Sequence, residues 1–467
     1  MKMTTINENK ELAKGTVYRQ WISSLLASTL CFTYGLQTGW MSPAISTLQS
    51  AYSPSGYPLS SIEISWIASV LCISAMLTCL PHSRIVDRFG RKFALINCAV
   101  LQAVGFIIKL ISAHPISLLT SQTFCGIASG GIFIVMPLYI KEISTDSLRG
   151  ILGTVYMLLQ SVGILTMYAL GAFFSFYTVL WTVVWIPIIN IIGLLMTPES
   201  PGYLVKKGRI DEAVSVMAYL RGVDVDNKEL QVELQRIKNE VAQFENSSKV
   251  SLRTIYSDKA ARRASALAIF LLTMLDMSGN FAIFTFASMI IRSSGGTFKP
   301  ELQSMMLPIV MIAGGLTSTV TVERCGRKPL MLSGMIVIGT SMCALASILL
   351  MQEKEINVHW SLPMLCIICS VFCHGTSLPV PYVVMSEIFN VQLRGKIMGY
   401  IVTFGWFEVF LQLFVFAPVS EYLGMYTMFY IFSGINLIGS VAVYILMPET
   451  KGKSLEEIEK ELVGENK

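Results

Sequence analysis

Long apolar runs separated by short polar stretches dominate the pattern of residues along the chain. Twelve runs of about 18 or more mostly apolar residues begin near positions 21, 64, 93, 117, 151, 177, 264, 302, 330, 361, 396 and 424. A helix needs about 20 apolar residues to cross the hydrocarbon core of a bilayer. Backbone polar groups in lipid must be satisfied within their own segment, which favours helices over open strands. The pattern therefore predicts an all-α membrane protein with twelve transmembrane helices.

Composition agrees with this class and excludes two others. The residues Ala, Val, Ile, Leu, Met, Phe, Trp, Tyr and Cys make up 53% of the 467 residues, and charged residues make up only 14%. Soluble domains carry about 25% charged residues and could not bury so much apolar surface. Disordered chains show the opposite bias, low hydrophobicity with high charge. The run from Trp21 to about Met41 is too long for the apolar region of a cleaved signal peptide, so we expect it to remain as the first span.

The positions of the basic residues predict the orientation in the membrane. If the N-terminus lies in the cytoplasm, all but four of the 35 Lys and Arg residues fall on the cytoplasmic side of the spans. The positive-inside rule describes this asymmetry, so both termini are expected in the cytoplasm. The exceptions are Lys109, Arg292, Lys299 and Lys354, and Lys109 is expected to extend its ammonium group to the membrane surface. The net charge of +5 then reflects topology and attraction to anionic lipid, and nothing indicates a nucleic-acid partner.

Neither the cysteines nor the polar stretches indicate catalysis. Nine of the ten cysteines lie within apolar spans and the tenth, Cys325, lies in a turn, which favours their use as small apolar residues. Cys366, Cys369 and Cys373 stand in one span without a second pair of metal ligands. The polar stretches contain no phosphate loop, metal-ligand cluster or nucleophile elbow. We therefore expect no enzymatic activity, no metal and no cofactor.

Three short motifs occur twice, in the same order and at nearly constant spacing. The sequence DRFGRK at 87–92 recurs as ERCGRK at 323–328, Glu142 with Arg149-Gly150 recurs as Glu387 with Arg394-Gly395, and PES at 198–200 recurs as PET at 448–450. Such internal repeats are typical of transporters built from two similar halves. The chain is therefore expected to form two parallel six-helix halves.

The repeats divide the chain into segments. We expect a cytoplasmic N-terminus at 1–20, a six-helix half at 21–197, a cytoplasmic linker at 198–263, a second six-helix half at 264–447 and a cytoplasmic tail at 448–467. Within the linker, apolar residues recur at helical spacing over 210–220 and 228–244. This spacing predicts short amphipathic helices that lie against the cytoplasmic face. The alternative is a flexible linker with transient helices.

The repeated motifs place acidic and basic side chains on turns where the two halves would meet when the cytoplasmic side closes. Transporters of this kind open alternately to the two sides of the membrane. One exposed ion pair contributes only about 0–1 kcal/mol, but a network of several could bias a two-state equilibrium. The alternative is that the arginines only hold the turns and bind lipid phosphates. The predicted cytoplasmic gate consists of Asp87, Arg88, Arg91, Glu142, Arg149, Glu199, Glu323, Arg324, Arg327, Glu387, Arg394 and Glu449.

These motifs resemble those of a known family. The two D/E-R-x-G-R-K turns, the E…R-G pairs, PESP at 198–201 and PETKGKSLEEIE at 448–459 are similar to those of the sugar porters of the major facilitator superfamily. Within that family, GLQTGWMSPAISTL at 35–48 and PVPYVVMSEIF at 379–389 resemble insect facilitated trehalose transporter-like proteins. The resemblance covers the whole chain. It implies the major facilitator fold and facilitative movement of a sugar across the plasma membrane.

The resemblance also implies a central sugar-binding cavity, and several positions there differ from the usual pattern of the family. Where the family carries a glutamine on the fifth span, this chain has Met157, with Gln160 nearly one turn away. The sequence LDMSGNF at 275–281 stands in place of QQ-S-G-x-N. The candidate substrate-binding residues are Trp406, Tyr382, Asp276, Ser278, Asn280, Gln160, Gln37, His374 and Glu408.

The chemistry of these side chains suits a small polar solute. Trp406 and Tyr382 offer aromatic faces to the apolar side of a pyranose ring, or else pack against lipid and neighbouring helices. An ionised carboxylate in mid-span costs ~3 kcal/mol or more, so Asp276 and Glu408 should each face water, a partner or the substrate. His374 is equally consistent with a ligand and with a packing residue.

Helix-breaking residues indicate which spans line the pathway. Ser278-Gly279 interrupts one span, and Pro379 with Pro381 interrupts another. Each interruption frees backbone groups that lipid could not satisfy. These two spans are therefore expected to face the cavity.

The same resemblance bears on coupling. Proton-coupled members of the family carry an Asp on the first span and an Arg on the fourth, and the matching positions here are Gln37 and Gln122. Neither amide titrates near neutral pH, which favours facilitated diffusion. The alternative is a symporter in which Asp276 carries the proton.

Three functions remain open from the sequence. The leading one is facilitative uniport of a sugar such as trehalose or a hexose by alternating access. The second is transport of another small polar or cationic solute, which Asp276 and Glu408 would suit. The third is a non-transporting sugar sensor, which the short tail after Pro448 makes less favourable.

Overall fold

The computed structural model is helical throughout its described part. It describes residues 2–247, 258–295, 299–356, 358–359, 361–389 and 391–463, and the side chains of all of these except 2–16, 243–247 and 391–396. Within these ranges no β-strand occurs. The prediction of an all-α protein is therefore confirmed.

The transmembrane segments follow the predicted apolar runs closely. In the described part of the chain, eleven segments are long and apolar enough to cross a membrane. The N-terminal half contributes α3 (Ser61–Phe89), α4 (Arg91–Ile111), α5 (Pro115–Ile143), α6 (Asp146–Phe173), and α7 (Phe176–Val183) with α8 (Trp185–Met196). The C-terminal half contributes α13 (Lys259–Asp276) with α14 (Asn280–Thr285), α16 (Pro300–Ser304) with α17 (Met306–Cys325), α18 (Arg327–Glu353), α19 (Ser361–Ser377) with α20 (Val380–Ile388), α21 (Val391–Leu423) and α22 (Met425–Leu446).

The helix α1 (Lys2–Gly39) supplies the first span, although it is less apolar than the other eleven. Several polar residues of its membrane-spanning part are shielded from lipid, and Ser24, Ser28 and Thr33 are fully buried. Thr33 Oγ1 donates a hydrogen bond to Gln102 Oε1 at 2.5 Å, which satisfies a polar group that the bilayer could not. With α1 included, the bundle has the twelve predicted spans.

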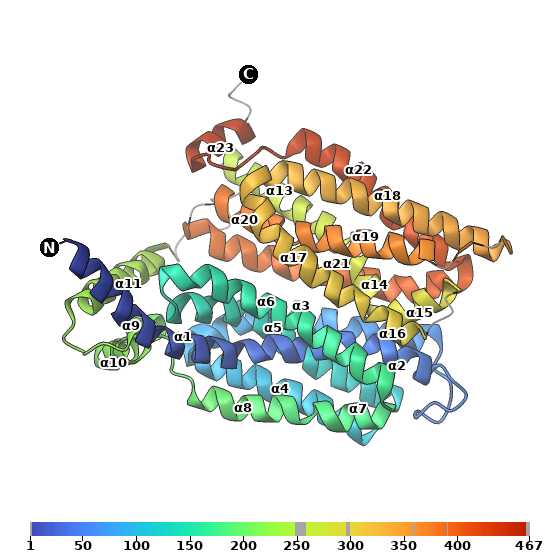
Figure 1. Cartoon of the computed structure of the whole chain (residues 1–467), viewed down its shortest axis with the longest axis horizontal. Helices are drawn as coiled ribbons and strands as arrows, with labels where there is room; N and C mark the ends of the chain where they lie inside the picture. Colours follow the sequence, from blue (N-terminus) through green and yellow to red (C-terminus); the bar gives the residue numbers. More distant parts are fainter. Residues whose placement is uncertain are drawn as a thin grey trace.

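The two halves lie side by side, as Figure 1 shows, with the N-terminal half in blue to green and the C-terminal half in yellow to red. The helices α9 (Pro201–Lys206), α10 (Ile210–Arg221) and α11 (Lys228–Ser247) lie at one end of the bundle, together with the start of α1 and with α23 (Leu455–Val463). We call this the linker end. The opposite end carries α2 (Met41–Leu48) and α15 (Ala287–Ser293), and we call it the loop end.

The linker helices pack on the N-terminal half. Arg221 Nη1 donates to the Ile143 carbonyl at 2.8 Å, and Arg236 Nη1 lies 2.8 Å from the Asp146 carboxylate. The Arg19 guanidinium donates to the Tyr219 carbonyl at 2.9 Å. The predicted helices over 210–220 and 228–244 are therefore confirmed, and they form a docked cap on one half.

Both predicted interruptions are present. The chain leaves helical geometry between α13 and α14, where Gly279 has φ of 95°, and between α19 and α20, before Pro379. A Cβ at Gly279 would lie 2.6 Å from the ring of Phe432, so the bend also depends on the missing side chain. The breaks divide the two spans into the helix pairs α13 with α14 and α19 with α20.

Candidate functional site

A charged cluster closes the turn between α3 and α4 at the linker end. Gly90, with φ of 100°, ends α3 and starts α4. The backbone N–H groups of Arg91 and Lys92 donate to Glu199 Oε1 at 3.0 and 3.1 Å. The Arg91 guanidinium donates to both carboxylate oxygens of Glu142, at 2.9 and 2.8 Å. Glu199 thus occupies the N-terminus of α4, where exposed N–H groups favour a negative charge.

The C-terminal half repeats this cluster. Gly326, with φ of 91°, joins α17 to α18, and the N–H groups of Arg327 and Lys328 each donate to Glu449 at 3.0 Å. The Arg327 guanidinium donates to Glu387 Oε1 at 3.1 and 2.7 Å. The sequence repeat is therefore a repeat of local structure.

Each cluster is completed within its own half. Arg149 pairs with Asp146 at 2.8 Å, Asp87 with Lys206 of the linker at 2.8 Å, and Glu323 with Arg327 at 3.1 Å. Among the described side chains no ion pair joins the two halves. The backbone carbonyls of Arg88 and Arg324 accept hydrogen bonds from Tyr203 and Lys451, and the Arg394 side chain lies outside the described residues. Ion pairing across the halves stays a prediction for the conformation in which the linker end closes.

Two residue pairs join the halves by hydrogen bonds toward the loop end. Ser42 Oγ on α2 lies 2.9 Å from Ser288 Oγ on α15 and accepts from the Ser288 N–H at 3.0 Å. The Tyr168 hydroxyl on α6 donates to the carbonyl of Phe284 on α14. In this conformation the halves are therefore fastened at the loop end.

A cavity of about 190 Å³ lies between the halves. Most of the predicted substrate-binding residues line it, and both interrupted spans contribute to it, as predicted. Those that line it are Gln37, Gln160, Asp276, His374, Tyr382 and Trp406. Residues from several distant parts of the chain thus meet around one space.

Three of the candidate substrate-binding residues, Ser278, Asn280 and Glu408, do not line this cavity. Asn280 Nδ2 donates to Ser278 Oγ at 3.2 Å, and Ser278 Oγ lies 3.4 Å from His374 Nδ1. These contacts hold the break in one span against the neighbouring span. Glu408 Oε1 accepts from Thr273 Oγ1 at 2.6 Å. It stands two residues after Trp406, about 200° further around the helix, and so points elsewhere.

An aromatic wall of three residues, which the sequence analysis only partly identified, faces the cavity. The rings of Tyr34 and Phe133 lie 5.1 Å apart, and Trp406 lies 6.4 Å from Tyr34 and 5.7 Å from Phe133, all edge to face. The indole N–H of Trp406 has no hydrogen-bond partner among the described residues. Tyr34 and Phe133 escaped the sequence analysis because an aromatic residue in a span looks the same whether it faces lipid or the cavity.

Lys109 is buried, which contradicts the prediction that it extends to the membrane surface. Its side chain has no exposed area. The ammonium group donates to Gln37 Oε1 at 2.9 Å and to Gln122 Oε1 at 3.5 Å, and it lies 4.1 Å from the ring centroid of Trp40. Gln37 also donates to Gln122. Lys109 therefore stands directly behind two amides of the cavity wall, where only packing of α1, α4 and α5 could place it.

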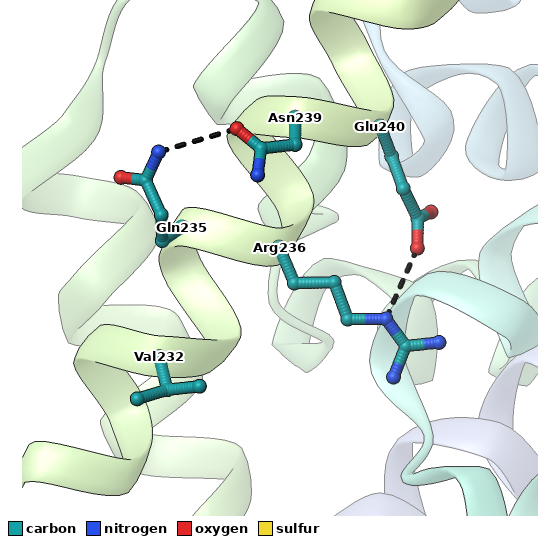
Figure 2. A pocket seen from close by; sticks show the side chains of 5 residues that line it. All are labelled: Val232, Gln235, Arg236, Asn239 and Glu240. Atoms are coloured by element: carbon teal, nitrogen blue, oxygen red, sulfur yellow. Dashed lines mark hydrogen bonds and ion pairs between the residues drawn. The ribbon is translucent and has the colours of Figure 1, made fainter.

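A second hollow lies on the outer surface of α11, shown in Figure 2. It is lined by Val232, Gln235, Arg236, Asn239 and Glu240, all from one helix. Gln235 bonds Asn239 at 3.2 Å, and Arg236 pairs with Glu240 at 3.3 Å. Its polar groups satisfy one another, so the central cavity is the candidate site.

Comparison with known proteins fits this geometry. The family model described as "Sugar (and other) transporter" matches residues 23–462. The chain belongs to this transporter family. The facilitated trehalose transporter Tret1 of Bombyx mori is 23% identical over 453 residues, which cover 96% of this chain and 88% of that protein. The probable metabolite transport protein CsbC of Bacillus subtilis is 28% identical over 434 residues, covering 92% and 91%.

Solved structures show the same fold. The inward open conformation of the xylose transporter XylE from E. coli superposes with a TM-score of 0.78 at 18% sequence identity, covering 93% of this chain and 98% of that chain. Its partially occluded inward open conformation gives a TM-score of 0.76 at 15% identity. The protein therefore has the major facilitator fold, with twelve membrane-spanning segments in two parallel halves of six, as predicted.

Proposed function

We propose that the protein moves a sugar across the plasma membrane by facilitated diffusion, through alternating access to the central cavity, and that it catalyses no chemical reaction. The observation that carries this proposal is the cavity between the two repeated halves. Hydrogen bonds join the halves at the loop end of this cavity. Rocking of the halves about that cavity would open it to each side in turn.

The cavity chemistry suits a sugar. Gln37, Gln122 and Gln160 supply amides on the N-terminal side for hydroxyl groups, and the aromatic wall supplies ring faces for C–H groups. The volume of about 190 Å³ is below the roughly 300–1,000 Å³ of sites for drug-sized ligands. In this conformation the cavity therefore suits a monosaccharide better than a disaccharide.

The direction of opening follows from charge. The linker end carries the repeated basic turns, so by the positive-inside rule it faces the cytoplasm together with both termini. The segments 21–197 and 264–447 are then the moving halves, and the helices α9 to α11 form a cap on the first of them. The conformation described here would have its outer side fastened, and the charged clusters would meet when the cytoplasmic side closes.

The absence of a titrating pair at the first and fourth spans favours uniport. Gln37 and Gln122 bond each other directly, and the neighbouring ammonium group of Lys109 donates to their oxygens. Two amides held in this way have no proton to exchange near neutral pH. A symporter with Asp276 as the proton carrier is the alternative that transport driven by a pH gradient would reveal.

Purified protein in liposomes tests the proposal. Labelled glucose and trehalose should enter by a saturable route without a pH gradient, and glucose should compete with xylose. Trp406→Ala should reduce glucose entry strongly because it removes a ring of the aromatic wall, whereas Trp181→Ala, at a side chain with 57% exposure on α7, should not. Absence of saturable entry for every sugar would overturn the proposal.

A further inference from the structure

The cavity carries one acidic side chain without a partner. Asp276 ends α13 at the break before α14, and its side chain is 6% exposed. Its carboxylate makes no hydrogen bond or ion pair with any described side chain or N–H group, although the residue lines the cavity. A buried carboxylate is expensive unless it is paired, so the surroundings of Asp276 should explain why it is tolerated.

The surroundings are acidic and aromatic. Glu408 acts electrostatically on Asp276 and carries the same sign of charge. The hydroxyl groups of Tyr34 and Tyr382 also lie within electrostatic range of the Asp276 carboxylate. No Lys or Arg is among the residues that line the cavity. Among the described side chains, the carboxylate therefore has no cation beside it to neutralise it.

The one buried cation nearby cannot take that role. The ammonium group of Lys109 is held by the oxygens of Gln37 and Gln122 and by the ring of Trp40 on the opposite, N-terminal wall. The two amides stand between it and the cavity, because they line the cavity and Lys109 does not. The two walls thus differ in charge, with a shielded positive group on one side and an unshielded negative group on the other.

Carboxylate and aromatic rings together are the groups that recognise an organic cation. A cation within about 6 Å of an aromatic ring centroid is attracted by the ring, most strongly where water is excluded. The backbone of Gly405 approaches the Asp276 carboxylate so closely that a Cβ there would lie 2.6 Å from Oδ2, and Trp406 follows directly. A proton alone would neutralise Asp276, but it would gain nothing from the aromatic wall.

We propose that the preferred passengers of this cavity are sugars that carry a protonated amine, with the ammonium group held by the Asp276 carboxylate beside the aromatic wall. This inference rests on the proposed sugar transport and names its substrate class. The ammonium group donates to the carboxylate, and the hydroxyl groups of the sugar bond the amides of the opposite wall. The preference for the charged amine depends on the unpaired carboxylate, and the aromatic wall adds to it.

The experiment compares two hexoses that differ only in the amine. Purified protein in liposomes is offered labelled glucosamine and labelled glucose at equal concentration and without a pH gradient. The wild-type protein should take up glucosamine with a kcat/KM about tenfold or more above that for glucose, the scale of one charge-assisted hydrogen bond. Asp276→Asn should abolish this ratio, and Asp276→Glu should restore part of it.

Glu421→Gln is the matched control. Glu421 is an exposed acid near the end of α21 and does not line the cavity, so its removal should leave the ratio of the two sugars near the wild-type value. As a second measurement, glucosamine should raise the unfolding temperature of the wild-type protein more than glucose does. This binding measurement keeps the test valid if the Asp276→Asn protein does not fold.

Other results would overturn the inference. Saturable entry of glucose with no preference for glucosamine would refute it and leave the proposed sugar transport intact. Preference for an organic cation without hydroxyl groups, such as tetraethylammonium, would refute the sugar part. Glucose entry that a pH gradient drives in the wild-type protein but not in Asp276→Asn would show that Asp276 binds a proton instead. Absence of entry for every sugar would refute both proposals together.

Discussion

The two halves of the bundle are nearly identical at their linker ends and different at their cavity walls. In each half a glycine with positive φ joins two spans, two backbone N–H groups bind a glutamate from the end of the sixth span, and an arginine pairs with a second glutamate. These features appear in both halves with similar distances. What is repeated therefore serves the shape of each half, whatever the passenger.

The cavity walls show no such repetition. The N-terminal wall presents amides backed by the buried ammonium of Lys109, whereas the C-terminal wall presents the carboxylate of Asp276, His374 and Trp406. We therefore expect recognition to depend on the residues that the repeat did not preserve. Motifs that identify the family accordingly say little about the substrate.

The largest effect is expected from breaking the repeated arginine in the half where its glutamate partner is better buried. Arg91 and its partner Glu142 have side chains only 7% and 15% exposed, so Arg91→Met should lower the free energy of unfolding by about 3–5 kcal/mol. Arg327→Met should lower it less, because its partner Glu387 is 24% exposed and can turn to water more easily. Denaturant unfolding in detergent measures both. Arg209→Met, in an exposed pair, is the control, and a larger effect for Arg327 would contradict the ranking.

Removing Lys109 tests whether the charge behind the N-terminal wall matters for recognition. Lys109→Met leaves the buried oxygen of Gln37 without its donor, which should lower the free energy of unfolding by about 1–3 kcal/mol. It should also raise the KM for glucose, because the amides lose their fixed orientation. Lys354→Met, at an exposed lysine, should change neither quantity. An unchanged KM for Lys109→Met would show that Lys109 does not affect sugar binding.

A smaller effect is expected at the loop end. Tyr168→Phe removes the hydrogen bond to the Phe284 carbonyl, worth about 0.5–1.5 kcal/mol, so the population opened at that end should rise about 2- to 10-fold. Distances between spin labels on the two halves measure this population. Tyr177→Phe, at a tyrosine 42% exposed, is the matched control. An equal shift in both variants would show that the loss of any hydroxyl, and not this bond, is responsible.

The smallest effect is a pH dependence at the C-terminal charged cluster. Burial raises the pKa of Glu449, but the backbone N–H groups of Lys451, Arg327, Lys328 and Thr450 lower it more, so the pKa lies below its ordinary value. Its contribution to stability is therefore fully present above pH about 4.3 and is lost as the pH falls through the folded pKa. Glu449→Gln should make the free energy of unfolding less dependent on pH between about pH 6 and pH 3, roughly the range over which an ordinary carboxyl group titrates. Glu456→Gln, which removes an exposed acid, should leave the slope unchanged.

The sequence predicted the fold better than the site for a physical reason. Spans, helix breaks at Gly279 and Pro379, and the two charged turns depend on local runs and short motifs, and the structure has all of them. The burial of Lys109 could not be predicted, because its partners Gln37 and Gln122 come from two other helices. Facing directions within a span follow from packing between helices, which no local pattern encodes.

The same limit explains which candidate residues line the cavity. Asp276 and His374 stand next to helix breaks, where side chains turn inward, and both line the cavity. Glu408 was chosen because a charge in a span demands a partner, and the structure supplies that partner as Thr273 outside the cavity. A charged residue in a span therefore indicates a need for pairing, and only its position relative to a break indicates the pathway.

The most direct test of alternating access uses two pairs of spin labels on one protein. At the linker end, one label is attached to Phe89→Cys and the other to the native exposed Cys325, which occupies the equivalent position of the second repeat. At the loop end, the labels are attached to Tyr52→Cys and Leu302→Cys. On addition of sugar, we predict that the linker-end distance shortens while the loop-end distance lengthens, and that Trp406→Ala abolishes both changes. Distances that stay fixed, or that change in the same direction at both ends, would contradict the account.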